Sequence, residues 1–485
     1  MRLLIIILVC ISRACLAQPP DTLWTRTYGG NAFDEARSVQ VTHDGGFIFA
    51  GGTWSYGAGS QDIYIVKLDS LGNEEWSRTY GTEYSESAHK ILVLADGYLA
   101  AGYYSSWPPF PPEPSTGWLL RLDNNGDTLW TKRCGFNQGF SWFLDIIQTQ
   151  DGGFVGTGFS YPAGNYQTWI MRFNQNGDSL WNRSYGGPGR EQGFKVDATP
   201  DGGFVVAGVT TSYGAGYDDI WLLKVDASGD SLWSRTFGGP SYEGASALTA
   251  TPDGGFLLGG YTASLGISYD NAWLVKTDSF GNYEWDTVIE GYSSDYALYI
   301  NAVSVADSGA YYAAGRFETT TEISEGWFVK FDSRGDSLWT LRWPRSDLNY
   351  FEDLTSIPGG GFMLAGIADY EHNDSTGDAW LVRLTPEAMP VGDEFKPVAE
   401  AYGLNVYPNP VNGVATISLS VPRQVKSDIH LYDVLGRQIA VFSTGILHPG
   451  GQQFQMDMSH YPSGKYFLSV CIDEQYQNVP LIVLR

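Results

Sequence analysis

The sequence predicts an all-β protein: a seven-bladed β-propeller of four-stranded blades, whose last blade is closed by the N-terminal strand, followed by a small C-terminal β-sandwich. Three observations support this prediction. A tryptophan recurs about every 52 residues, each repeat holds four strand-like runs, and a different strand pattern begins near residue 404. The predicted segments are a signal peptide at 1–17, the propeller at 18–385, a linker at 386–403 and the sandwich at 404–485.

The repeat is defined by tryptophans that lie 51 to 54 residues apart. They are Trp24, Trp76, Trp130, Trp181, Trp233, Trp285 and Trp339. Each lies in a run such as DSLWSRTFGG, which is followed by a strand-like run, a DGGF turn, a run such as FVVAGV and a run such as AWLVKTD. Four runs rich in β-branched and aromatic residues, separated by Gly and Asp, predict a four-stranded antiparallel blade.

The order of the runs predicts how the ring closes. With strands named a to d from the centre outward, each regular tryptophan marks a d strand. The chain begins with a d strand at 22–28 and ends with an a-b-c set at 354–384. Seven d strands therefore match seven a-b-c sets only if the first strand completes the last blade, which leaves no open edge between blades.

A second series opens the third strand of the later repeats. Its members are Trp118, Trp169, Trp221, Trp273, Trp327 and Trp380. We expect both series to pack as large plates between neighbouring blades.

The turn before each d strand resembles the blade repeat of quinoprotein-like propellers, whose motif is LDxxGxxxW. Here Leu68-Asp69-Ser70-Leu71-Gly72 precedes Trp76. The resemblance implies the propeller fold. The vicinal cysteine pair of those quinone enzymes does not occur in this sequence, so we predict no cofactor.

The first residues predict export. An apolar run at 3–9 follows Arg2, and Cys15-Leu16-Ala17 offers small residues before a cleavage site, as in a secretory signal peptide. No apolar stretch is long enough for a transmembrane segment. The whole chain has 54 acidic and 29 basic side chains, a net charge of -25, which argues against nucleic acid as a partner because phosphates would be repelled.

The C-terminal segment contains three motifs in order. They are Asn405-Val406-Tyr407-Pro408-Asn409-Pro410, then a YDVLGR run that ends in Gly436 and Arg437, then a YPSGKY run that ends in Gly464, Lys465 and Tyr466. The segment resembles the type A sorting domain of the type IX secretion system, the outer-membrane export route of Bacteroidota. This resemblance implies transit through the periplasm, recognition of residues 404–485 by the outer-membrane translocon, and removal by a sortase-like peptidase in the linker. The passenger is then secreted or held at the cell surface.

Motifs for catalysis or metal binding are scarce. No HExxH, GxSxG or CxxC occurs, and the calcium-like turn at 123–127 has no closing glutamate, so we interpret it as a turn and predict no metal site and no catalytic residue. A carboxylate recurs just before the a strand at Asp34, Glu86, Glu191 and Glu243. These carboxylates form either a cation site at the channel mouth or, more often at a repeated position, structural hydrogen-bond acceptors.

A better candidate is a set of aromatic residues outside the repeat. Trp54 and Trp107 lie in b-to-c connections and Trp142 lies where the chain enters an a strand, and such connections emerge on one face of a propeller. The second blade has the longest b-to-c insertion, residues 103–112, which contains Tyr104 and Phe110 and is stiffened by prolines. Tyr56, Tyr161 and Tyr166 add rings in adjoining loops. The alternative is that Trp107 and Phe110 only cover the loop's own base.

These observations favour an exported binding propeller that holds a glycan or other extracellular polymer on the face with Trp54, Tyr104, Trp107, Phe110 and Trp142. Two alternatives remain open. One is a secreted polysaccharide-active enzyme that uses carboxylates at the channel mouth. The other is a structural surface protein whose propeller has no ligand.

Overall fold

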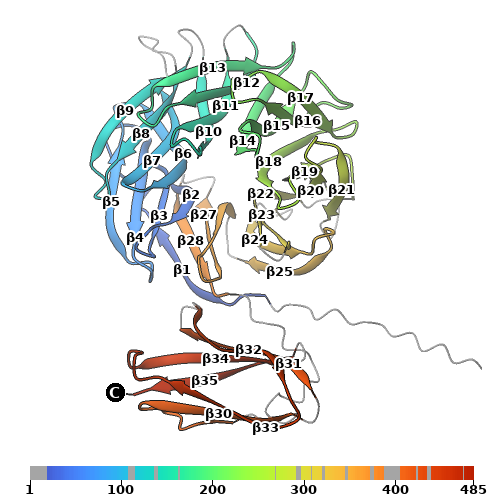
Figure 1. Ribbon diagram of the computed structural model, residues 1–485. Coiled ribbons are helices and arrows are strands. Elements are labelled where there is room, and N and C mark those ends of the chain that lie inside the picture. The colour runs from blue at the N-terminus through green and yellow to red at the C-terminus, as the bar shows by residue number, and fades with distance from the viewer. Residues whose placement is uncertain are drawn as a thin grey trace, which may run out of the picture. The chain divides into compact units, whose positions relative to one another are not determined.

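Figure 1 shows the computed structural model of the chain. It describes residues 19–106, 115–135, 140–161, 164–267, 269–290, 297–306, 309–318, 323–344, 348–371, 376–386, 405–421, 424–433, 438–472 and 475–484. The predicted signal peptide at 1–17 and most of the predicted linker lie outside these ranges. One compact unit, Thr22–Ile357 with Phe362–Leu384, contains the first 28 strands, and a second contains the C-terminal strands.

The first unit is the predicted seven-bladed propeller, with each blade running from the centre outward (Figure 1). Six blades are continuous in sequence. The first blade consists of β2 (Asp34–Val41), β3 (Phe47–Thr53), β4 (Asp62–Leu68) and β5 (Glu74–Tyr80), and the second of β6 (Ser85–Leu94), β7 (Gly97–Ser105), β8 (Thr116–Leu122) and β9 (Thr128–Cys134). The third blade consists of β10 (Ser141–Gln148), β11 (Phe154–Ser160), β12 (Gln167–Phe173) and β13 (Ser179–Tyr185), and the fourth of β14 (Glu191–Ala198), β15 (Phe204–Thr210), β16 (Asp219–Val225) and β17 (Ser231–Phe237). The fifth blade consists of β18 (Glu243–Ala250), β19 (Phe256–Thr262), β20 (Asn271–Thr277) and β21 (Tyr283–Ile289), and the sixth of β22 (Ala297–Val305), β23 (Tyr311–Glu318), β24 (Ser324–Phe331) and β25 (Ser337–Trp343).

The seventh blade joins the two ends of the propeller, as the order of the strands predicts. It consists of β26 (Leu348–Ser356), β27 (Phe362–Glu371), β28 (Thr376–Leu384) and β1 (Thr22–Tyr28). Strand β1 pairs antiparallel with β28, so that Trp24 lies opposite Arg383 and Tyr28 opposite Ala379. The indole Nε1 of Trp380 also donates a 2.7 Å hydrogen bond to the hydroxyl of Thr25. The N-terminal strand therefore closes the ring.

Burial across a blade follows the position of the strand. Every residue of β3, β4, β15 and β16 is buried, because neighbouring blades cover both faces of these middle strands. This explains their largely apolar sequence. The outermost strands, such as β5 and β17, mix exposed and half-buried residues.

The regular tryptophans pack between blades, as predicted. The ring of Trp76 lies 6.1 Å from that of Tyr98 in the next blade, and Trp181 lies 6.3 Å from Phe204. The glycine of the LDxxG turn accommodates the same indole: Gly126 has a φ of +81°, and a Cβ there would come within 3.0 Å of Trp76. The glycine and the tryptophan recur together because six of the seven regular tryptophans, all except Trp339, cover the turn glycine of the following blade.

A repeated ion pair joins the a-to-b turn to the c strand. The pKa is lowered to about 2 at Asp44, Asp151, Asp201 and Asp253. At Asp44, burial by itself would raise the pKa, but hydrogen bonds from Lys67 and Thr42 outweigh burial. At Asp151 the hydroxyl of Thr149 contributes most to the lowered pKa. The ionised carboxylates therefore stabilise the folded state.

Acid should weaken the propeller through these four carboxylates. Because their pKa in the folded state is below the unfolded value of about 3.9, their stabilising contribution is complete above that pH and is lost as the pH falls toward about 2. We expect the melting temperature to fall across this window. A variant with all four changed to Asn should have a lower melting temperature at pH 6 and a flatter dependence on pH, and an equally steep dependence in that variant would contradict the assignment.

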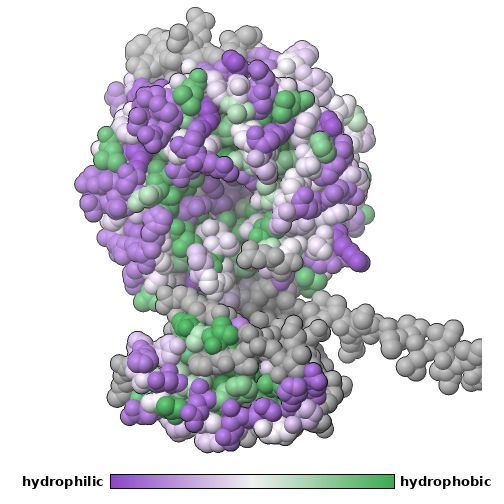
Figure 2. Space-filling model, viewed as in Figure 1, coloured by the Kyte–Doolittle hydropathy of each residue, from purple (hydrophilic) through white to green (hydrophobic). Residues whose placement is uncertain are grey.

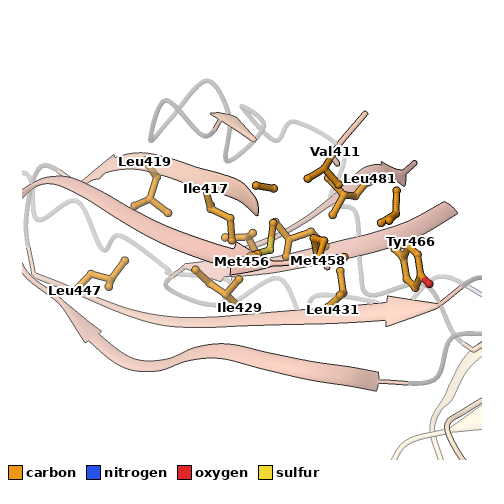
Figure 3. Packing of buried hydrophobic residues seen from close by; sticks show 14 of the residues in the cluster. Val411, Ile417, Leu419, Ile429, Leu431, Leu447, Met456, Met458, Tyr466 and Leu481 are labelled. Carbon is orange, nitrogen blue, oxygen red and sulfur yellow. The ribbon is translucent and has the colours of Figure 1, made fainter. Parts of the chain in front are cut away.

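The second unit contains two facing sheets. One consists of β29 (Asn405–Tyr407), β30 (Val414–Val421) and β33 (Gly450–Asp457), and the other of β31 (Val425–Asp433), β32 (Gln438–Leu447), β34 (Gly464–Ile472) and β35 (Gln475–Val483). Figure 3 shows Ile417 and Met456 from the first sheet facing Ile429 and Leu431 from the second. All four are 0 % exposed, so this β-sandwich has a core of its own.

Candidate functional site

A pocket of about 630 Å³ opens where the b-to-c and d-to-a connections of the early blades emerge. Its described lining consists of Ser60, Ser85, Tyr103, Ser105, Ser115, Phe140, Trp142, Phe159, Tyr166, Arg190 and Gln192. Figure 2 shows the propeller hollowed at its centre, with hydrophilic and hydrophobic residues mixed on the rim. The volume is within the range of small-molecule binding sites, and the lining combines rings with a few polar groups.

A stacked pair of aromatic rings forms one wall of the pocket. Tyr103 on β7 and Trp142 on β10 lie 4.2 Å apart at an interplanar angle of 15°. The ring of Phe159 lies 5.3 Å from Trp142, and Tyr166 meets Phe159 edge-on at 5.4 Å. The wall therefore joins rings from two neighbouring blades.

A buried hydrogen-bond network holds Tyr103 in place. The Tyr103 hydroxyl donates to Gln61 Oε1 at 2.9 Å, and Gln61 Nε2 donates to Glu35 Oε1 at 3.2 Å. The same oxygen of Glu35, a residue only 2 % exposed, also accepts from Arg37 and Ser87. Because this network fixes the tyrosine before any ligand arrives, less side-chain entropy is lost on binding.

The polar part of the lining contributes few full charges. Ser115 donates to the hydroxyl of Ser105 at 2.9 Å, and Gln192 adds an amide. Arg190 is the basic residue among the described lining residues, and its guanidinium binds Asp218 Oδ2 at 2.6 Å. The pocket is thus suited to a polar but uncharged ligand.

The recurring carboxylates accept hydrogen bonds from the chain itself. Asp34, Glu86, Glu191 and Glu243 are all 0 % exposed. Glu191, for example, accepts hydrogen bonds from the backbone N–H of Gly187 at 2.9 Å and of Ser212 at 3.2 Å. These contacts agree with the interpretation of the carboxylates as structural acceptors, which hold the connection before the a strand in these four blades. In the described part of the chain no three His, Cys, Asp or Glu side chains meet in a group suited to a metal ion.

The calcium-like turn uses its own carboxylate. Asp123 Oδ1 accepts from the backbone N–H of Asn125 at 2.8 Å and of Asp127 at 2.9 Å. The aspartate therefore closes the turn, which agrees with the interpretation of this motif as a turn.

The prediction that Tyr104 belongs to the binding face is wrong. Tyr104 is 1 % exposed and lies in the core, where the guanidinium carbon of Arg133 lies 3.5 Å from its ring centre. Successive side chains of a strand point to opposite faces, so it is Tyr103 and not Tyr104 that faces the pocket.

The other predicted aromatic residues differ in where they lie. Trp142 and Tyr166 line the pocket. Trp54 is 44 % exposed but is not part of the described lining, because it packs edge-on against Phe33 at 5.2 Å, which in turn contacts Tyr370. Trp107 and Phe110 lie outside the described residues.

The sorting motifs lie at strand ends of the sandwich. Tyr407 is 49 % exposed at the end of β29, next to Pro408 and Pro410, while Asn409 Oδ1 accepts a 2.9 Å hydrogen bond from the backbone N–H of Ile482. Tyr466 is buried, with its hydroxyl donating to the carbonyl of Pro462 at 2.9 Å. Asn405 begins β29, and Gly464 and Lys465 begin β34. Gly436 and Arg437 lie outside the described residues.

Residues 405–484, which form this sandwich, match the family model described as secretion system C-terminal sorting domain. The protein is an exported one. The sorting domain implies interaction with the type IX secretion machinery, and secretion or attachment to the cell surface follows from it. No segment of the ranges that the structure describes forms an apolar helix of membrane-spanning length.

Comparison with curated proteins finds no match to the chain. Among solved structures, the chain is similar to a fungal alcohol oxidase of the AA5 family in complex with copper, with 12 % identity, a TM-score of 0.48 and coverage of 96 % of this chain and 99 % of the other. A Trypanosoma rangeli sialidase is similar at 8 % identity and a TM-score of 0.37, covering 85 % and 86 %. The WD40 domain of SCAP from fission yeast is similar at 8 % identity and a TM-score of 0.36, covering 95 % and 97 %.

Proposed function

We propose that the propeller is an exported binding module that holds a glycan or a related extracellular polymer in the pocket at the channel mouth. The observation that carries this proposal is the stack of Tyr103 on Trp142, which forms a fixed aromatic wall beside hydroxyl and amide groups. Sugar rings present apolar C–H faces and hydroxyl edges, and this combination of an aromatic wall and neutral polar groups complements both.

Binding is favoured over catalysis because the recurring carboxylates are already engaged. Each is buried, and Glu191 and Glu243 use their oxygens on backbone N–H groups of the connections. A secreted polysaccharide-active enzyme remains the alternative, and it predicts product formation from a bound sugar. A structural surface protein predicts no binding at all.

Glycan-array screening followed by calorimetry on the mature chain tests the proposal. Loss of one pocket ring, in Trp142→Ala or Tyr103→Ala, should weaken binding by about tenfold, as expected for a ring that contributes about 1.4 kcal/mol. Trp54→Ala is the matched control, since it removes an exposed indole that does not line the described pocket. Trp142→Phe should keep most of the affinity and shows whether the alanine variant merely misfolds. Equal affinity of all variants would refute the pocket as the binding site.

We also propose that a sortase-like peptidase cuts within residues 386–403 and removes the sandwich at 404–485. The motif at 405–410 and the separate core of the sandwich support this arrangement. The propeller blades resemble quinoprotein-like repeats only in the LDxxGxxxW motif, and membership of that family stays a prediction.

A further inference from the structure

A second aromatic platform lies on the same face of the propeller. Tyr217, in the b-to-c connection of the fourth blade, and Tyr242, in the d-to-a connection before the fifth, stack at 4.9 Å with an interplanar angle of 11°. Tyr217 is 65 % exposed and Tyr242 is 48 % exposed. Two stacked rings that remain open to solvent bury little of their own surface, so packing alone does not account for them.

Backbone hydrogen bonds hold the platform in a defined position. The N–H of Tyr217 donates to the carbonyl of Ser241 at 2.9 Å, and the N–H of Glu243 donates to the carbonyl of Asp218 at 2.8 Å. Asp218 and Tyr242 form an isolated parallel bridge between the two blades. The rings are therefore presented by connections that are tied together, rather than by independent loop tips.

One ion pair links the platform to the pocket. Arg190 lines the pocket, and its guanidinium binds Asp218, the residue directly after Tyr217. Asp218 is 7 % exposed, while the Arg190 side chain is exposed, so the pair lies at the surface with its carboxylate buried. The pocket wall in blades two and three and the platform over blades four and five are thus parts of one continuous surface.

The charge of this surface restricts the ligand. Arg190 is neutralised by Asp218, and the chain as a whole carries a net charge of -25, so we expect a polyanion to be repelled from this surface. Two aromatic platforms joined by an ion pair that carries no net charge match a chain of uncharged sugar rings, in which successive residues stack on successive platforms.

We propose that the binding site extends from the Tyr103–Trp142 pocket across Arg190 and Asp218 to the Tyr217–Tyr242 platform, and that its ligand is a linear, uncharged polysaccharide. This inference rests on the proposed function of the pocket and specifies its ligand class. Short oligosaccharides occupy the pocket only, and longer ones also reach the platform.

The test is the dependence of affinity on chain length. The probes are neutral linear gluco-, xylo-, manno- and galacto-oligosaccharides of two to eight units, with oligogalacturonides as the acidic counterpart, each titrated against the mature chain by calorimetry. We expect at least one neutral series to gain about tenfold in affinity from the shortest to the longest member. The double variant Tyr217→Ala, Tyr242→Ala should lose this gain while keeping the affinity for the shortest binding member.

The control is Tyr283→Ala, which removes a tyrosine that is 57 % exposed on the outermost strand β21. It should bind all lengths as the unchanged protein does. A length gain that survives in the double variant, or no gain with length, would overturn the extended site while leaving the pocket intact. Preference for the acidic series would overturn the ligand class. Failure of every neutral probe to bind would overturn the pocket and its extension together.

Discussion

Removal of residues 19–28 from the mature chain is expected to destabilise the propeller by more than about 5 kcal/mol, because the deletion opens the ring and takes away a packed tryptophan. Strand β1 supplies the whole outer edge of the seventh blade, and Trp24 packs edge-on against Phe47 of the first blade at 6.2 Å. Without β1, the row of backbone groups on β28 loses its partners and the Trp380 indole loses its acceptor on Thr25. An edge left unpaired in this way also invites aggregation.

Thermal and denaturant unfolding of the truncated and full mature chains measure this effect. A synthetic peptide of residues 19–30, added in excess, should restore part of the lost melting temperature by pairing with β28. Leu23→Ala is a suitable control within the same strand, since Leu23 is 41 % exposed and its loss should change stability by less than about 1 kcal/mol. A truncated chain that melts with the full chain would show that β1 does not close the ring.

The second large effect concerns a buried guanidinium in the closing blade. Arg383 is 5 % exposed, and its Nε and Nη1 have no hydrogen-bond partner among the described residues. Burial lowers the pKa of Arg383 to about 10. An unpaired buried donor on a charged group destabilises the folded state by about 1 to 3 kcal/mol.

Other blades provide this position with carboxylates. Lys67, the corresponding residue of the first blade, binds Asp44 of its turn and Glu75 of its outer strand, both at 2.8 Å. Lys276 of the fifth blade binds Asp253 and Glu284 in the same way, both at 2.9 Å.

The seventh blade lacks both carboxylates. In the repeat alignment, Leu23 takes the place of the outer-strand glutamate, and Gly359 takes the place of the turn aspartate. The missing partner therefore has a defined position from which it can be restored.

Leu23→Glu should accordingly stabilise the mature chain by about 1 to 3 kcal/mol, since it supplies the missing carboxylate from the outer strand. The gain should appear as a higher melting temperature at pH 7. Leu23→Gln, which has nearly the same shape without the charge, should gain less. In the background of Arg383→Met the glutamate should bring no gain, and an equal gain there would contradict the pairing.

The fold was predictable because the residues of one packing contact between neighbouring blades recur along the sequence. Six of the seven regular tryptophans cover a turn glycine of the next blade, as Trp76 covers Gly126, and this contact requires both residues to recur together. The order of the strands then determined the closing blade. The separate sandwich was predictable from motifs at its strand ends, such as the turn around Asn409.

The candidate site was only partly predictable, for two physical reasons. The first is strand alternation. Tyr104 aligns with Ser160, Thr210 and Thr262 of other blades, all 0 % exposed, so the repeat already carried the signal that this position is interior and that Tyr103 faces the channel mouth.

The second reason is that the pocket joins residues distant in sequence. Arg190 and Gln192 from the fourth blade meet Tyr103 from the second only through the curvature of the ring. No local pattern distinguishes them from the same positions in other blades. Conversely, Trp54 stands out in the sequence as an irregular tryptophan on the expected face, but it packs on Phe33 and does not line the described pocket.

A crystal structure of the mature chain with a bound neutral oligosaccharide tests the central claim most directly. The account predicts a sugar ring against the Tyr103–Trp142 wall, with further units directed past Arg190 toward Tyr217 and Tyr242. A sugar bound elsewhere on the protein, with this pocket empty, would contradict it.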